Sequence, residues 1–170
     1  MSRILSAMTP EGWAAYEKWF GLAVDDPTIS RFSYGQAYLD RLKAMPTSTW
    51  DIAYFVQCKG LGLGYMSFDR PARSAKPTVL VVDSPQNRIV GGLLFRRLLI
   101  EAKRNNSDWI ESSCSETNVP SVAIHQKLFG DPWGTEPHSN FDPALGQFVP
   151  RIYFKARLDV LLEKRKGAPA

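Results

Sequence analysis

The feature that most constrains the fold lies between Thr78 and Arg104, where an apolar run breaks into a polar loop and then becomes a helical pattern. The run Thr78–Val82 has no polar alternation, which is typical of a strand buried on both faces of a sheet. Asp83-Ser84-Pro85 ends this run, and an apolar stripe at helical spacing then extends from Gly91 to Arg104. A central strand that passes into a helix in this way predicts a mixed α/β domain.

Strand and helix patterns also flank this segment on both sides. The predicted elements, in chain order, are a strand at Arg3–Ala7, helices that start at Thr9-Pro10-Glu11 and cover Ser33–Met45, strands at Trp50–Gln57, Leu61–Phe68 and Thr78–Val82, a helix at Gly91–Arg104, a strand at Asp108–Cys114, a helix from Asn118 to Leu128, strands at Trp133–Pro137 and Val149–Leu158, and a helical extension at Asp159–Lys166. A polar loop is predicted through Asn140 and Gly146. The glycines at 60, 62 and 64 either weaken their strand or mark a bulge.

Length and composition set the broad class of the protein. The chain of 170 residues can bury a core and shows no internal repeat, so we expect one domain over residues 1–158 with a basic extension at 159–170. Hydrophobic residues at 44% and charged residues at 22% are typical of a soluble globule. No run approaches the roughly 18 apolar residues that cross a bilayer, and the N-terminus lacks the apolar core of a signal peptide. We therefore expect a cytoplasmic protein with no membrane partner.

The cysteines and the basic residues narrow the chemistry. Cys58 and Cys114 lie far apart and have no metal-ligand spacing, so we expect reduced thiols and no metal. The net charge is +4, and basic residues collect on the helix before Arg104 and in Lys164-Arg165-Lys166. Such runs are either solvated helix faces or sites that collect an anionic ligand. Because aromatic residues are not interleaved with them, nucleic acid is not an expected partner.

The order of elements and two motifs resemble the GNAT superfamily of N-acetyltransferases over nearly the whole chain, from Ile4 to about Leu158. The acetyl-CoA loop of that family is written Q/R-x-x-G-x-G/A, and Gln86-Asn87-Arg88-Ile89-Val90-Gly91 stands in its place between strand and helix. Asn118–His125 resembles the N-x-x-A-x-x-x-Y helix, and Lys127–Gly130 resembles its K-L-G-F ending with the last two residues exchanged. The resemblance implies an α/β (α+β) fold with a mixed, mostly antiparallel central sheet of about six to seven strands flanked by helices, in the order β-α-α-β-β-β-α-β-α-β-β.

The resemblance also implies acetyl-CoA as a co-substrate bound at the strand-to-helix segment, with no metal. Backbone N–H groups at a helix N-terminus have no intrahelical partner, and the helix dipole places partial positive charge there, so this segment suits a pyrophosphate. Strand backbone would bind the peptide-like pantetheine arm by strand addition, and Asn118 would hold the pantetheine or cap its own helix. The implied cofactor residues are Val81, Val82, Gln86, Asn87, Arg88, Ile89, Val90, Gly91, Gly92 and Asn118.

Two departures from the family pattern bear on activity. Ile89 replaces the first glycine of the loop, which would be costly at positive φ, although the loop would still donate N–H groups in ordinary helical geometry. His125 stands where the family often has the tyrosine that protonates the departing thiolate, and a histidine can also donate a proton. The alternative for His125 is a packing or surface role. Glu111 and Asp83 are the candidate general bases, and each is otherwise a solvated or capping carboxylate.

The function that the resemblance implies is acyl-CoA-dependent N-acyl transfer, with the acetyl group of acetyl-CoA passing to a primary amine by direct attack. The acceptor is left open between a small molecule and a protein, and a homodimer is also left open. Ile89 and the missing tyrosine motivate an alternative, a catalytically inactive protein-binding module on the same fold.

Overall fold

The structure is a computed structural model that describes residues 3–6, 52–57, 61–81 and 87–166, together with the single positions 11, 14, 26, 27 and 31. The described strands follow the hydrogen-bonded order β1-β2-β3-β4-β5-β7-β6. The β4–β5 pair is parallel, whereas β1–β2, β2–β3, β5–β7 and β6–β7 are antiparallel. The mixed, mostly antiparallel sheet predicted from the sequence is therefore confirmed. The two predicted N-terminal helices lie outside the continuously described residues.

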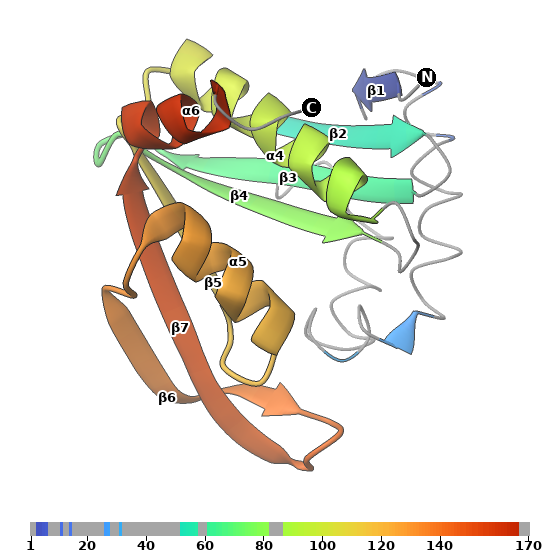
Figure 1. Ribbon diagram of the computed structural model, residues 1–170, viewed down its shortest axis with the longest axis vertical. Coiled ribbons are helices and arrows are strands. Elements are labelled where there is room, and N and C mark those ends of the chain that lie inside the picture. Colours follow the sequence, from blue (N-terminus) through green and yellow to red (C-terminus); the bar gives the residue numbers. More distant parts are fainter. Residues whose placement is uncertain are drawn as a thin grey trace. The chain divides into compact units, whose positions relative to one another are not determined.

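The chain divides into two compact units, Met1–Ser67 with Pro77–Leu98 and Phe68–Lys76 with Leu99–Ala170. The strands of the first unit are β1 (Arg3–Ser6), β2 (Ile52–Gln57), most of β3 (Leu61–Asp69) and the end of β4 (Ser74–Val81). Its continuously described helix is the first part of α4 (Asn87–Arg104), which is labelled in Figure 1. The expected single domain with an extension at 159–170 remains a prediction.

Two glycines of β3 allow α4 to pack closely on the sheet. A Cβ atom added at Gly62 would lie 2.7 Å from Val90 Cγ1 and 2.8 Å from Leu94 Cδ1. At Gly64 the nearest atom would be Leu94 Cδ2, at 3.2 Å. Val90 and Leu94 are fully buried. The β2–β3 register runs from Ile52↔Met66 to Gln57↔Leu61 without a shift, so these glycines mark a close helix–strand contact and not a bulge.

The central strand differs in extent from its prediction. It begins at Ser74 and not at Thr78, because the turn Arg70–Arg73 joins β3 directly to β4. β4 lies between β3 and β5, as expected for a central strand. Its residues from Thr78 to Val81 are half-buried, so the predicted full burial on both faces is not observed.

The second unit contains β5 (Trp109–Ser115), α5 (Val119–Phe129), β6 (Gly134–Asp142), β7 (Gln147–Arg157) and α6 (Leu158–Lys166). β5 pairs with β7 along its whole length, and α5 packs on these two strands (Figure 1). Its core includes Ile110, Phe154, Leu158 and Leu161, each less than 5% exposed.

The polar loop predicted through Asn140 was wrong. Residues Gly134–Asp142 form β6, which pairs with β7 and has a register shift between Glu136 and Asn140. His138 takes a positive φ of 54° within this shift, so the polar segment is accommodated as an irregularity inside a strand.

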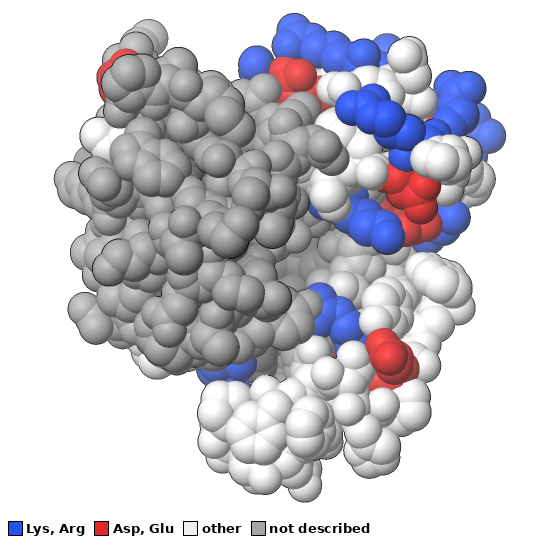
Figure 2. All heavy atoms as spheres, turned by 180° about the vertical axis from the view of Figure 1, so that it is seen from behind, with Lys and Arg blue, Asp and Glu red and all other residues white. Residues whose placement is uncertain are grey.

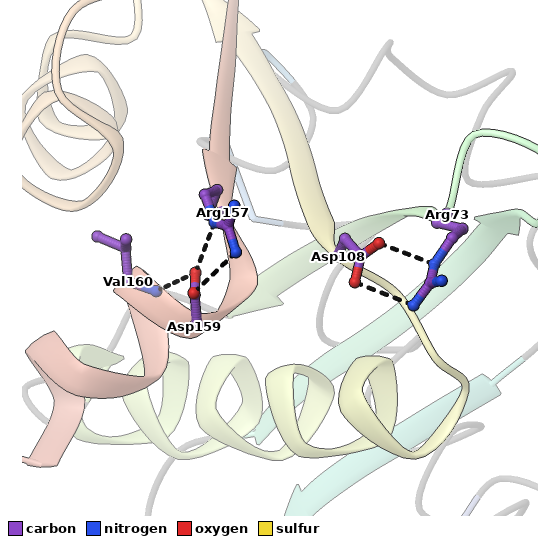
Figure 3. Close-up of polar contacts among 5 residues, drawn as sticks. All are labelled: Arg73, Asp108, Arg157, Asp159 and Val160. Atoms are coloured by element: carbon purple, nitrogen blue, oxygen red, sulfur yellow. Dashed lines mark hydrogen bonds and ion pairs between the residues drawn. The ribbon is translucent and has the colours of Figure 1, made fainter.

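Two ion pairs lie within the second unit, one at the start of β5 and one at the end of β7 (Figure 3). Two of the three guanidinium nitrogens of Arg73 contact Asp108, with Nε 2.8 Å from Oδ2 and Nη2 3.1 Å from Oδ1. The carbonyl of Arg73 also accepts hydrogen bonds from the N–H groups of Asp108 and Trp109. Arg157 pairs in the same two-point manner with Asp159, whose Oδ1 also accepts the N–H of Val160 at the start of α6. The N–H of Leu158 also donates to the carbonyl of Asp108 at 2.8 Å, so the β3–β4 turn, the start of β5 and the β7–α6 junction are held together.

Candidate functional site

The first turn of α4 is the segment predicted to bind the pyrophosphate. α4 begins at Asn87 and not at Gly91, so the helical conformation covers most of the motif. The N–H groups of the first turn have no intrahelical acceptor, and no acidic residue lies in that turn. The basic residues Lys103 and Arg104 lie in the last turn, where they complement the opposite end of the dipole. The local electrostatics of the helix start therefore favour an anion.

Ile89 lies in ordinary helical geometry. It is not among the described residues with positive φ, and its side chain is 62% exposed. The backbone strain that a β-branched residue would suffer at a glycine-specific position is therefore absent. The N–H of Ile89 is one of the helix-start donors, so the substitution does not remove a donor from the motif.

Of the other residues predicted to bind the cofactor, some belong to the hydrophobic contact between β4 and α4, and some lie outside the described residues. Val90 is fully buried, and Val81 packs against the cluster that Val90 forms with Leu94. A Cβ atom at Gly91 would lie 3.7 Å from Val81 Cγ2, an ordinary contact, so packing alone does not require glycine there. Only the helical backbone is described for Asn87 and Arg88, and Gly92 continues the helix. Val82, Asp83 and Gln86 lie outside the described residues.

Asn118 caps α5, as the sequence allowed. Its Oδ1 accepts the N–H of Ser121 at 3.3 Å, and its carbonyl accepts the N–H of Val122 at 2.9 Å. Proline in the first turn suits a position where no intrahelical donor is needed. The capping role is therefore present, and the pantetheine role of Asn118 remains a prediction.

His125 lies on the inner side of α5 and is hydrogen-bonded through both ring nitrogens. Nε2 is 2.8 Å from Ser112 Oγ on β5, and Nδ1 is 2.7 Å from the carbonyl oxygen of Ser121. The ring also packs on two aromatic rings, with centroids 5.7 Å away at Phe129 and 5.0 Å away at Phe154. Ser112 was not anticipated from the sequence. Only the period of β5 pointed to it, since Ser112 shares a strand face with the buried Ile110 and Cys114.

These contacts determine the tautomer of His125. A carbonyl oxygen only accepts, so Nδ1 carries the hydrogen and donates it to Ser121. In the neutral ring Nε2 is then the acceptor, and the Ser112 hydroxyl donates to it. Burial lowers the pKa of His125 from its ordinary value, and the hydrogen bond to the Ser121 carbonyl partly opposes this effect. The resting imidazole is therefore neutral near pH 7.

Glu111 lies on the opposite face of β5 from His125 and is engaged by two lysines. Its Oε1 is 3.0 Å from Nζ of Lys155, the residue directly across on β7, and its Oε2 is 3.7 Å from Nζ of Lys76 on β4. The Glu111 side chain is 24% exposed. Glu111 and His125 are thus separated by the thickness of the strand, and the structure does not bring them together.

The same face of the second unit continues as a polar surface. Arg151 donates from Nε to Ser113 Oγ at 2.8 Å and from Nη1 to Asn140 Oδ1 at 2.9 Å. Tyr153 donates its hydroxyl to Glu136 at 2.6 Å, which raises the pKa of Tyr153. In the described part of the surface shown in Figure 2, acidic side chains lie among the basic ones.

Comparison with solved structures defines the fold of the chain. The chain has the fold of the GNAT N-acetyltransferases. A GCN5-related N-acetyltransferase from Kribbella flavida is 20% identical, with 92% of this chain and 97% of that chain covered and a TM-score of 0.69. A putative acetyltransferase from Salmonella typhimurium, solved with its cofactor acetyl-CoA, is 18% identical over 93% and 94% of the two chains, with a TM-score of 0.63. A spermidine N-acetyltransferase from Vibrio cholerae is 13% identical over 97% and 99%, with a TM-score of 0.68.

No family model matches the chain, and no curated protein matches its sequence. The structural likeness therefore defines the fold alone. Within the described parts of the chain, no helix has both the length and the apolar character to span a membrane.

Proposed function

We propose that the chain is an acyl-CoA-dependent N-acyltransferase that transfers the acetyl group of acetyl-CoA to a primary amine by direct attack. The observation that carries the proposal is the start of α4, where the acetyl-CoA motif of the family coincides with helix N–H groups that have no intrahelical acceptor and with a first turn without acidic residues. The likeness of the fold to solved N-acetyltransferases, one of them with acetyl-CoA, supports this proposal.

The reaction that this proposal implies is balanced without a metal. The deprotonated amine nitrogen forms a bond to the thioester carbonyl carbon, and a backbone N–H of the central strand stabilises the oxyanion. The C–S bond then breaks, and CoA leaves as a thiolate that takes up a proton. Alignment of the two substrates contributes a large part of the rate in such reactions.

The proposed proton donor to the thiolate is His125, and the proposed bases for the amine are Glu111 and Asp83. For Glu111 this role requires exchange of a partner. An acceptor ammonium would replace Lys76, the more distant of its two lysines at 3.7 Å, before losing its proton. Asp83 lies outside the described residues, so its role is tested only by substitution.

Calorimetric titration with acetyl-CoA tests the first step. We expect heat of binding and a thermal shift, since a ligand at about 100 times its Kd adds about 2.7 kcal/mol to the unfolding free energy. The second step measures thiol release with a panel of primary amines, from polyamines to peptides. Absence of both heat and thermal shift at millimolar acetyl-CoA would exclude the proposed enzyme.

One observation favours the alternative of an inactive protein-binding module. Both nitrogens of His125 are occupied by hydrogen bonds inside the unit, as in a histidine retained for packing. A protein that binds acetyl-CoA but releases no thiol with any amine would support this alternative. Acceptor-dependent thiol release would exclude it.

A further inference from the structure

The hydrogen bonds of His125 restrict the routes by which its ring can exchange a proton. Nδ1 donates to a backbone carbonyl at 2.7 Å, and this acceptor belongs to the same helix, one turn earlier. A proton cannot leave through Nδ1 without breaking that bond. Nε2 is 2.8 Å from Ser112 Oγ, so the hydroxyl stands between this nitrogen and any third group. Every exchange that keeps the Nδ1 bond therefore passes through Ser112.

We propose that Ser112 is the hydroxyl relay through which His125 exchanges protons with the reacting groups. This inference rests on the proposed acyl transfer and deepens it, because it replaces a single donor by a pair. In the neutral state the Ser112 hydroxyl donates to Nε2. When the ring is protonated the hydrogen bond reverses, so that Nε2–H donates to Ser112 Oγ and the hydroxyl hydrogen is released for a new acceptor.

The step conserves protons and needs no further reactant. After the amine attacks, the nitrogen of the tetrahedral adduct loses a proton to Ser112 Oγ while Ser112 gives its hydroxyl proton to Nε2, so the neutral ring becomes the imidazolium. When the C–S bond breaks, the transfer runs in reverse: the imidazolium gives its Nε2 proton to Ser112 Oγ, and Ser112 gives its hydroxyl proton to the thiolate sulfur. The ring returns to the neutral tautomer that the structure shows, and the thiol carries the proton that the amine lost.

Among the described residues, those that contact the ring or its hydrogen-bond partners are uncharged. They are Ser112 and Cys114 from β5, Phe154 from β7, and Ser121 and Phe129 from α5. Burial raises the pKa of Cys114, so it stays a neutral thiol near pH 7. Glu111 and Lys155 pair on the other face of the sheet. Lys164 of α6 donates to the carbonyl of Leu128 at the end of α5.

Ser113 supplies a matched control because it neighbours Ser112 and points the other way. Its Oγ accepts from Arg151 on the opposite face of β5, and this contact has no part in the proposed relay. Ser112→Ala and Ser113→Ala are the same chemical change on adjacent residues. Ser112→Thr keeps a hydroxyl at the relay position and serves as the conservative variant.

The test combines steady-state kinetics with histidine NMR. We expect Ser112→Ala to lower kcat by about a hundredfold, in the range of a lost general acid, and to leave the KM for acetyl-CoA within about twofold. Ser112→Thr should retain most of the activity, and Ser113→Ala should keep the wild-type pH profile of kcat. In the NMR spectrum, the wild-type ring should show the Nδ1–H tautomer. Ser112→Ala should raise the pKa of His125, because Nε2 loses a donor that stabilises the neutral ring.

The outcomes separate this inference from the proposed function. The chain has two histidines, so His138→Gln assigns the two ring signals. If the wild-type protein releases thiol and Ser112→Ala does so at the same rate with the same pH profile, the relay is wrong and the acyltransferase stands. Equal losses in Ser112→Thr and Ser112→Ala, with acetyl-CoA binding retained, also overturn the relay. A wild-type protein that releases no thiol overturns both.

Discussion

Gly62→Ala is the substitution whose cost can be worked out most directly from the structure. The added Cβ would lie 2.7 Å from Val90 Cγ1 and 2.8 Å from Leu94 Cδ1, well inside van der Waals contact. Both neighbours are fully buried, and Val90 is β-branched, so neither side chain has an easy alternative rotamer. Overpacking of this kind costs about 1–3 kcal/mol. Gly62 is not among the described glycines with positive φ, so alanine fits the backbone and recovers up to about 1 kcal/mol through the unfolded state.

The net expectation is a loss of about 1–2 kcal/mol in unfolding free energy, equivalent to a Tm lower by about 2–8 °C for a chain of this size. Urea denaturation of a matched series measures it. Gly64→Ala should cost less, because its Cβ would meet Leu94 Cδ2 at 3.2 Å. Gly91→Ala should be neutral or stabilising by up to about 1 kcal/mol, because the contact is ordinary and alanine favours the helix.

Val90→Ala provides the internal check on this reasoning. It removes the Cγ1 atom that the new Cβ would meet at Gly62, so the double variant should be more stable than the sum of the two single changes predicts. A Gly62→Ala protein as stable as the wild type, or a double variant that is simply additive, would show that the contact between β3 and α4 is not tight.

Three further predictions test the second unit. Asn118→Ala should cost about 1 kcal/mol of unfolding free energy by loss of the cap, whereas Asn118→Ser should keep the stability and lower the acetyl-CoA affinity only if the side chain binds the pantetheine. Because the pKa of His125 is lowered in the folded state, its contribution to stability is present above the ordinary pKa of 6.5 and is lost as the pH falls through the folded value. Urea denaturation at a series of pH values should show this loss of unfolding free energy in the wild type and in His138→Gln. The loss should be absent from His125→Gln. Thr117→Val should cost about 1–3 kcal/mol, because Asp142 is 2% exposed and accepts the Thr117 hydroxyl at 2.7 Å; guanidinium denaturation measures it, and an unchanged midpoint would refute it.

Local patterns predicted most strands and helices but not their exact ends. The alternation and capping signals around β5 and α5 were accurate to one residue, since asparagine is a favoured N-cap and proline follows it in the first turn. The start of α4 was placed four residues too late, from Asn87 to Gly91, because the apolar stripe begins later than the backbone hydrogen bonds do. β6 was missed over half its length because its residues pair with β7 through contacts that no local pattern records.

The sequence predicted which residues belong to the candidate site, but it did not predict the residues that they contact. The sequence placed His125 on the helix after β5, but it did not indicate the Nε2 partner Ser112, which lies on another element and is 13 residues away. Glu111 was a candidate base on its position alone. Its ion pairs with Lys155 and Lys76 follow from strand pairing, which the sequence does not state.

The glycine that sterically matters in the first unit is not the one that the family motif indicates. The loop motif directs attention to Ile89, where a glycine is replaced, and to Gly91. Yet Ile89 is exposed in ordinary helical geometry, and Gly91 has room for a methyl group. The tight approach of α4 to the sheet is secured from the strand side, by Gly62. The close contact with β3 positions the helix without the missing glycine. The substitution at Ile89 therefore removes neither the helical geometry nor the N–H donors of the first turn that a phosphate would need.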